Sequence, residues 1–270
     1  MIRRSTLLGL VVAAALAASV ADGRSAAPVT LRIVFPEGLT VRQMADQAAH
    51  VRRIAIRKRG VTPRLTGKAY AAAAARARVP SGFARFLKRR SVEGFLFPAL
   101  YEFTPRTTAS ELVAKQIAEF ERRWSTVDLR SAGSRGQSPY AVLTIASLVE
   151  RETAVPQERA LVAAVIANRL ERGMPLGIDA SLRYGLGIEG TKSITRAHLR
   201  SPTPYNTHRF KGLPPTPIGN PGLASLRAAG RPAAVDYLFY LRIPGTVRHF
   251  FTADEQEFCA KALEYGYAGC

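Results

Sequence analysis

The sequence has few of the side chains that bind metals. Only two cysteines, Cys259 and Cys270, and four histidines occur among its 270 residues, and the histidines are far apart. No group of them has the Cys/His spacing of a structural zinc site. We therefore expect no metal ion and no cofactor. The two cysteines are close to the C-terminus, where an oxidising compartment would allow a disulfide between them.

Acidic residues are also scarce. The chain has 20 Asp+Glu against 39 Lys+Arg, which gives a formal net charge of +19. So basic a chain is attracted to polyanions such as nucleic acid, an anionic membrane surface or an acidic polymer. The arginines are scattered, however, and a compositional bias of the coding sequence would produce the same excess. The charge alone therefore does not identify a partner.

A long hydrophobic run is missing, because the apolar stretch at the N-terminus is short. It extends from Leu7 to Ala21 behind Arg3 and Arg4, whereas a membrane-spanning helix needs about 20 apolar residues. Positive charge followed by a short apolar core is typical of a secretory signal, and a short retained anchor is the alternative. In both cases the arginines stay inside. We expect residues 1–27 to be a signal or membrane anchor, and the remainder to be extracytoplasmic, either held at the cell membrane or secreted after cleavage.

The rest of the chain predicts a small module followed by a larger domain. Residues 28–92 begin with a strand, a Pro-Glu-Gly turn and a helix that Thr40 can cap, as in a small α+β module. Residues 93–270 combine helices, a few short strands and long Pro- and Gly-rich loops, which more often shape a cleft than serve as connectors. One helix begins at Ser138, a capping residue, with Pro139 in its first turn. The predicted fold class is α+β.

The segment "ASLVERET", residues 146–153, places two glutamates in this otherwise apolar helix. On a helical wheel Glu150 and Glu152 lie about 200° apart, on the two flanks of the apolar stripe. The stripe consists of Val142, Ile145, Ala146 and Val149, and the opposite polar face consists of Thr144, Ser147 and Arg151. A carboxyl at the margin of a buried stripe is partly desolvated, which raises its pKa and suits a general acid. Structural salt bridges are the alternative, and the wheel does not say which glutamate would be the acid.

Around these glutamates the sequence resembles the endolytic murein transglycosylases, the YceG-like family of bitopic membrane enzymes that cut nascent peptidoglycan. The resemblance rests on "LTIASLVERETAVPQERALVAAVIANRLERGMPLGIDASLRYGLG", on "SPTPYNTHRFKGLPPTPIGNPGLASLRAA" and on "HFFTADEQEF". It reaches back through "VEGFLFPALYEF" to "FPEGLTVRQMA". Residues 28–92 accordingly look like the family's LysM-like module, and residues 93–270 like its catalytic domain.

The resemblance implies non-hydrolytic cleavage of the β-1,4 bond between N-acetylmuramic acid and N-acetylglucosamine by one glutamate. Lysozyme-like transglycosylases present this acid in a Glu-Ser pair at the end of a helix, and Glu152-Thr153 matches that pair better than Glu150 does. Glu152 is therefore the implied acid and Glu150 the second choice. Implied partners are peptidoglycan glycan strands, with cell-wall synthases as companions and the membrane through the N-terminal segment. The export segment argues against nucleic acid.

Six residues stand where the resemblance suggests contacts with the substrate: Glu150, Asp179, Tyr205, Asn206, Thr207 and Asn220. Tyr205 offers a ring that can stack on a sugar, and Asn206 and Thr207 offer amide and hydroxyl groups. The alternative is that they pack a loop and that Asn220 forms a turn.

The chain departs from the family at several positions. Ala180 and Ser181 replace the proline and threonine of an Asp-Pro-Thr stretch, and Ala99-Leu100 replace Asp-Thr in the connector, whereas His249 matches a family histidine. Two other classes compete with the enzyme. One is a non-catalytic peptidoglycan-binding envelope protein, and the other is a polyanion-binding protein.

Overall fold

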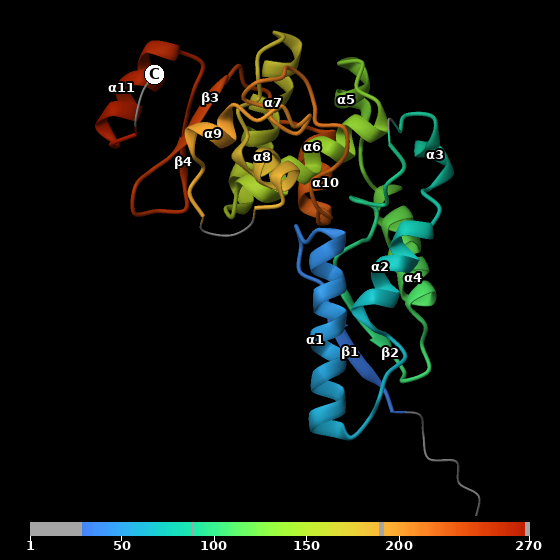
Figure 1. Ribbon diagram of the computed structural model, residues 1–270. Coiled ribbons are helices and arrows are strands. Elements are labelled where there is room, and N and C mark those ends of the chain that lie inside the picture. Colours follow the sequence, from blue (N-terminus) through green and yellow to red (C-terminus); the bar gives the residue numbers. More distant parts are fainter. Residues whose placement is uncertain (1–28, 88, 189–191, 268–270) are drawn as a thin grey trace, which may run out of the picture.

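The computed structural model describes residues 29–267, except residue 88 and residues 189–191. Within this part of the chain an N-terminal module projects as an arm from a larger C-terminal body (Figure 1). The mixture of helices and short strands confirms the α+β class. No helix in the described part is both long and apolar enough to cross a membrane. The expected signal or anchor at residues 1–27 lies outside the described residues.

The N-terminal module is built on a two-stranded antiparallel sheet. Strand β1 (Leu31–Val34) pairs with β2 (Leu100–Phe103), with Leu31 opposite Phe103. Alternate residues of both strands are buried, so that one face of the sheet contributes to the core. The helices of the module are α1 (Val41–Arg59), α2 (Gly67–Arg76), α3 (Ser81–Ala84) and α4 (Ala109–Trp124).

Helix α1 begins where the sequence predicts. The Thr40 hydroxyl accepts a hydrogen bond from the Gln43 backbone N–H at 3.2 Å, and the Gln43 side chain accepts one from the Thr40 N–H at 2.8 Å. These reciprocal bonds form a capping box. The core behind α1 includes Phe35, Met44 and Leu112, so it draws on residues on both sides of position 92. The boundary between residues 92 and 93 and the LysM-like character of the module stay predictions.

Helix α6 (Pro139–Glu152) is the central element of the C-terminal body. Its N-terminus confirms the prediction, because the Ser138 hydroxyl accepts a hydrogen bond from the Ala141 N–H at 3.1 Å and Pro139 occupies the first turn. Three helices pack against α6: α7 (Arg159–Glu171), α8 (Asp179–Leu186) and α10 (Leu223–Gly230). Every residue from 142 to 149 is buried.

The solvent-facing polar side predicted for α6 is therefore wrong for two of its three residues. The Thr144 and Ser147 side chains are buried, with only 1% and 0% exposure. The Thr144 hydroxyl donates to the Tyr140 carbonyl at 2.8 Å, and the Ser147 hydroxyl accepts from the Ile218 N–H at 3.0 Å. Helices α7, α8 and α10 pack against α6, the loop residue Ile218 reaches Ser147, and the hydroxyls are satisfied within the protein.

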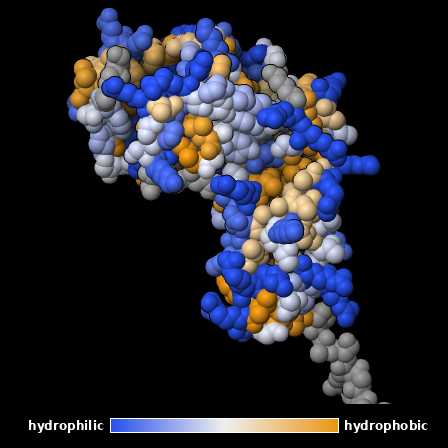
Figure 2. Space-filling model, in the orientation of Figure 1, coloured by the Kyte–Doolittle hydropathy of each residue, from blue (hydrophilic) through white to orange (hydrophobic). Residues whose placement is uncertain are grey.

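The remaining elements are short. They are α5 (Arg130–Ser134), the 3-10 turn η1 (Pro156–Glu158), α9 (Arg196–Leu199), strand β3 (Phe239–Arg242), strand β4 (His249–Thr252) and α11 (Glu255–Glu264). Strands β3 and β4 form an antiparallel hairpin in which Tyr240 stands opposite Phe251. Cys259 on α11 is disulfide-bonded, and its expected partner Cys270 lies outside the described residues. Hydrophilic side chains cover much of the visible surface of arm and body (Figure 2).

Backbone hydrogen bonds connect the arm to the body, between residues 38–39 and Asn220. The Gly38 N–H donates to the Asn220 carbonyl at 2.8 Å, and the Asn220 N–H donates to the Leu39 carbonyl at 2.9 Å. A β-carbon on Gly219 would lie 2.6 Å from the Gly38 carbonyl oxygen, and one on Gly222 would overlap the Glu37 carboxyl. This approach is possible because both positions lack a side chain.

Candidate active site

Glu152 is the last residue of α6 and faces a cleft. The helix ends because Thr153 is extended (φ −129°, ψ 133°), and its hydroxyl accepts a hydrogen bond from the Val155 N–H at 3.0 Å. The cleft has a volume of about 370 Å³ and is lined by the end of α6, the first residue of α7 and the β3–β4 hairpin. The lining residues are Glu150, Arg151, Glu152, Thr153, Ala154, Arg159, Arg242, Val247 and His249.

Tyr240 holds the carboxyl of Glu152. Its hydroxyl donates a hydrogen bond to Glu152 Oε2 at 2.8 Å from strand β3, 88 residues further along the chain. Burial raises the pKa of Tyr240 well above its usual value, and the neighbouring Glu152 carboxylate adds to this effect. The hydroxyl therefore keeps its proton and remains a donor at any physiological pH.

The surroundings of Glu152 favour its protonated form. Burial is the largest effect and raises the pKa of the carboxyl, and the negative charge of Asp179 raises it further. The Tyr240 hydrogen bond, the charge of His249 and the Ala180 backbone N–H act in the opposite direction, but the pKa stays above its usual value. The C-terminal end of α6 also disfavours a negative charge at this position. Glu152 can therefore supply a proton at a pH where an exposed glutamate could not.

His249 is fixed next to Tyr240 by a buried carboxylate. Glu158 accepts a hydrogen bond from the His249 N–H at 3.1 Å and lies 2.7 Å from the ring Nδ1. The ring of His249 meets that of Tyr240 edge-on, with centroids 5.5 Å apart. The Glu158 carboxylate thus fixes the orientation of the imidazole ring beside Tyr240.

Asp179, a predicted site residue, is brought close to Glu152. It is the first residue of α8, its side chain is 58% exposed, and its Oδ1 lies 2.9 Å from Nε2 of His208. The preceding residue is held by Thr207, whose hydroxyl accepts from the Ile178 N–H at 2.9 Å. Although Ala180 replaces the expected proline, this contact fixes the start of α8.

Tyr205, Asn206 and Thr207 form a buried or half-buried turn behind this region. The Tyr205 hydroxyl is 2.9 Å from that of Thr216, and its ring packs 5.0 Å from the ring of Tyr184. The Asn206 amide donates to two backbone carbonyls at 2.9 Å each and accepts from the His208 N–H at 3.2 Å. These groups organise the loop, and direct contact with a ligand stays a prediction for all three.

Glu150 and Asn220 lie at the junction with the arm. Glu150 Oε2 accepts from the Gly222 N–H at 2.9 Å, and Oε1 lies 3.6 Å from the Arg159 guanidinium. Both glutamates of α6 line the cleft, but their carboxyls have different partners, since Glu152 is held by Tyr240 and Glu150 by Gly222 and Arg159. The Asn220 amide is fully buried and pairs with the backbone of Gly94, Leu96 and Leu39. A role for either residue in ligand binding stays a prediction.

Tyr240 and Glu158 were not predicted as site residues from the sequence. Phe239 and Leu241 on strand β3 are buried, and Tyr240 between them points to the opposite face of the strand. This alternation was the available sequence signal that Tyr240 is not a core residue of the strand. Glu158 lies six residues after Glu152 and carried no such signal. Among the described residues, no group of three or more His, Cys, Asp or Glu side chains could hold a metal ion.

The chain is similar to known proteins in both sequence and structure. The model of the YceG-like family matches residues 11–264. A crystal structure of a yceG-like protein from Listeria monocytogenes, at 2.6 Å resolution, superposes with a TM-score of 0.66 and 27% sequence identity. The superposition covers 84% of this chain and 74% of the other.

Two curated relatives are similar over the same extent of the chain. The endolytic murein transglycosylase of Bacillus subtilis (strain 168) is 33% identical over 153 residues, which is 57% of this chain and 42% of the relative. The protein of the same name from Streptococcus pneumoniae is 32% identical over 157 residues, which is 57% of this chain and 28% of the relative. The matched region thus spans less than half the length of either relative.

Proposed function

The chain belongs to the YceG-like family, and we propose from this premise that it is a peptidoglycan lytic transglycosylase whose general acid is Glu152. The observation that carries the proposal is the Glu152–Tyr240 pair, in which a buried carboxyl with a raised pKa faces a cleft. The names of the relatives from Bacillus subtilis and Streptococcus pneumoniae support the same activity.

In the proposed reaction Glu152 acts twice. It first gives its proton to the oxygen that bridges N-acetylmuramic acid and N-acetylglucosamine, while the bond from this oxygen to C1 of the muramic acid breaks. The C6 hydroxyl of the same muramic acid then attacks C1, and its proton passes to the Glu152 carboxylate. The acid is restored, no water is consumed, and the new end carries a 1,6-anhydro ring. The Tyr240 hydroxyl stabilises the carboxylate between the two proton transfers.

Asp179 is a second carboxylate near Glu152, and it could in principle act as the general base of a hydrolase. A hydrolase would use such a group to activate water. Asp179 is exposed and paired with His208, so we assign it an electrostatic role: its charge raises the pKa of Glu152. In the proposed reaction the negative charge of Asp179 also stabilises the positive charge that develops at C1. Hydrolysis and ring closure give products that differ by the mass of one water molecule.

The test is a digest of uncrosslinked glycan strands by the full chain, with the products read by mass spectrometry. We expect anhydromuramyl ends, and we expect Glu152→Gln to lower their formation by about 100-fold or more. Glu150→Gln, two residues away, is the matched control and should retain most activity. Loss with Glu150→Gln alone would move the acid to that residue, and reducing ends would indicate hydrolysis. Folded protein that binds strands without cutting them would favour the non-catalytic envelope protein.

We further propose that residues 1–27 direct the chain across the membrane and that the enzyme works outside the cytoplasm, beside the synthases that make its substrate. The charge order of Arg3 and Arg4 before an apolar run supports this orientation. Fractionation of cells that express the full chain, followed by N-terminal sequencing, would distinguish a retained anchor from a cleaved signal. Recovery of the uncut chain in the cytoplasm would contradict the proposal.

A further inference from the structure

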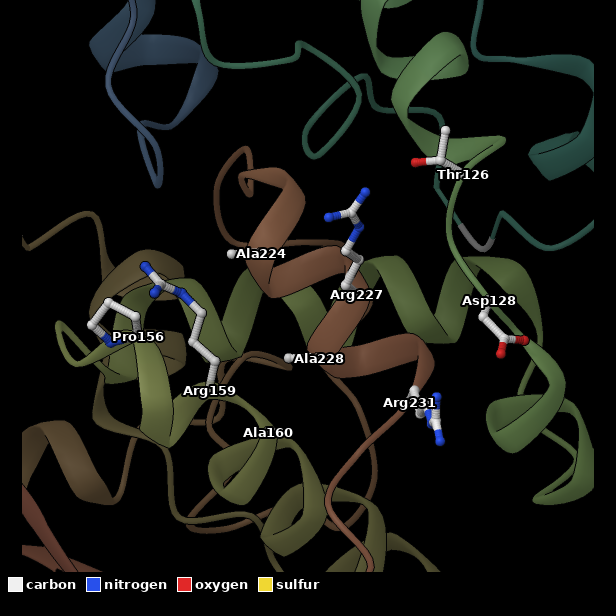
Figure 3. Close-up of a pocket in the computed structure, with 9 residues that line it drawn as sticks. All are labelled: Thr126, Asp128, Pro156, Arg159, Ala160, Ala224, Arg227, Ala228 and Arg231. Carbon is white, nitrogen blue, oxygen red and sulfur yellow. The ribbon is translucent and has the colours of Figure 1, made fainter.

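A second pocket opens on the other side of Arg159 from the Glu152 cleft. It has a volume of about 420 Å³ and lies between α7, α10 and the segment before α5 (Figure 3). Its lining is dominated by three small residues and three cations: Ala160, Ala224, Ala228, Arg159, Arg227 and Arg231. Small side chains leave the space open, and guanidinium groups surround it. We call it the arginine pocket.

The protein neutralises only part of the positive charge of the arginine pocket, since Arg159 is paired with Glu150 and Asp128 acts electrostatically on Arg231. Arg227 lies in the last turn of α10, and Arg231 directly follows the helix, with a backbone that is no longer helical (φ −139°, ψ 78°); both line the pocket. Within the described residues neither has an acidic group within 4.0 Å of its guanidinium. Asp128, which also lines the pocket, is engaged by Arg130 through its carboxylate at 2.8 Å. The pocket therefore has two cations available to a ligand.

Arg159 links this pocket to the Glu152 cleft. It lines both cavities, and its side chain is only 13% exposed. Its Nε donates to the Ser225 hydroxyl at 3.2 Å, and its guanidinium lies 3.6 Å from Glu150. These contacts hold Arg159 as a fixed wall shared by the two spaces. Because the same side chain lines both spaces, the two cavities are adjacent, and a ligand bound in the cleft lies next to the arginine pocket.

The chemistry of the lining indicates what this substituent is. Guanidinium groups bind carboxylates through paired, charge-assisted hydrogen bonds. The sugar rings of peptidoglycan are uncharged, but the peptides attached to its muramic acid residues carry carboxylates. We propose that the arginine pocket binds a carboxylate of such a peptide, so that the enzyme recognises strands that still bear their peptides. This inference rests on the proposed function.

The test compares two substrates and two double variants of the full chain. Arg227→Gln/Arg231→Gln removes the cations, and Arg53→Gln/Arg57→Gln on α1 is the control, because these arginines are exposed, have the same spacing and change the net charge equally. Glycan strands are supplied with their peptides or after enzymatic removal of the peptides. We expect the pocket variant to lower kcat/KM on peptide-bearing strands about tenfold. Its activity on stripped strands, and the activity of the control on both, should be unchanged.

A variant that fills the pocket provides an independent measurement. Ala224 is exposed on the first turn of α10, and Ala224→Phe changes no charge while it occupies the space. We expect it to reproduce the selective loss on peptide-bearing strands. Equal losses on both substrates would place the bound carboxylate on the sugar itself, and no loss with either variant would leave the pocket without a ligand; both results overturn the proposal. Inorganic phosphate provides a third test. If it inhibits the unmodified chain equally on both substrates and no longer inhibits the pocket variant, the pocket is a phosphate site and the proposal is overturned.

Failure of the proposed function gives a different result. If the unmodified chain produces no anhydro ends from either substrate, the transglycosylase is wrong. Binding of peptide-bearing and stripped strands to the Glu152→Gln chain, with and without the pocket substitutions, then still measures the pocket. A peptide-dependent affinity that falls about tenfold in the pocket variant would support it, and equal affinities would contradict it.

Discussion

The side-chain amide of Asn220 donates a hydrogen bond to the carboxyl of Glu93 at 2.9 Å, across 127 residues of sequence. The same carboxyl accepts from the Val41 N–H at the start of α1 and from the Tyr184 hydroxyl on α8. Three segments of the arm and body thus meet at one buried acid. Burial raises the pKa of Glu93 to about 8, although the hydrogen bonds lower it.

This buried acid makes stability depend on pH in a defined direction. The unfolded chain ionises Glu93 near 4.5, whereas the folded chain keeps it protonated up to about 8. The folded state therefore binds more protons between these values, and the free energy of unfolding falls as the pH rises through that window. Glu93→Gln cannot ionise, so we expect its free energy of unfolding, measured by urea denaturation, to fall less between pH 5 and 8 than that of the unmodified chain. If the free energy of unfolding changes equally with pH in both proteins, Glu93 does not titrate in this range.

Removal of the Asn220 amide should destabilise the junction. Asn220→Ala leaves the buried Gly94 and Leu96 N–H groups without this acceptor and removes a donor from the Glu93 carboxyl, whereas the Leu39 carbonyl keeps the backbone N–H of residue 220. Unsatisfied buried groups of this kind cost about 1–3 kcal/mol each, so we expect a loss of about 3 kcal/mol or more in the free energy of unfolding. Gln47→Ala removes one exposed hydrogen bond to the Val34 carbonyl and should cost less than about 1 kcal/mol. Similar losses in the two variants would contradict the role assigned to Asn220.

Tyr240→Phe removes the hydroxyl that donates to Glu152. Because this hydrogen bond lowers the pKa of Glu152, its loss should raise that pKa and move the basic limb of the kcat/KM profile to higher pH. We also expect kcat/KM to fall about tenfold, since the carboxylate loses a charge-assisted partner. Tyr237→Phe on the same hairpin is the control, because no hydrogen bond of its hydroxyl occurs within the described residues. Equal effects of the two substitutions would indicate a loss of packing only.

Asp179→Asn should shift the same limb the other way. The charge of Asp179 raises the pKa of Glu152, so its neutralisation lowers that pKa and moves the basic limb to lower pH. The opposite directions expected for Asp179→Asn and Tyr240→Phe separate electrostatic coupling from general damage to the site. A pH profile of Asp179→Asn that coincides with that of the unmodified chain would remove Asp179 from the electrostatics of the acid. Reducing ends from the unmodified chain, absent in the variant, would instead make it a base.

Features encoded locally could be predicted from the sequence. The caps at Thr40 and Ser138 and the position of Glu152 at the end of α6 depend on residues within a few positions of one another. The features that were missed depend on contacts between distant segments. Ser147 is covered by Ile218, 71 residues later, and Tyr240 reaches Glu152 across 88 residues. Helical periodicity contains no information about such contacts.

The junction between arm and body, where the backbones of residues 38–39 and 219–222 meet, also limits which mutations the chain can accept. At most buried positions a smaller or larger side chain is accommodated by its neighbours at some cost. Any side chain at Gly219 meets the Gly38 carbonyl, which is part of the backbone, whereas one at Gly222 meets only the carboxyl of Glu37, an exposed side chain that can move aside. A selection for function from random variants of this chain should therefore return glycine at position 219 and accept other residues at position 222. The same junction also includes the Glu150 carboxylate, which accepts from the Gly222 N–H, so the contact between arm and body continues onto the helix that carries the proposed acid.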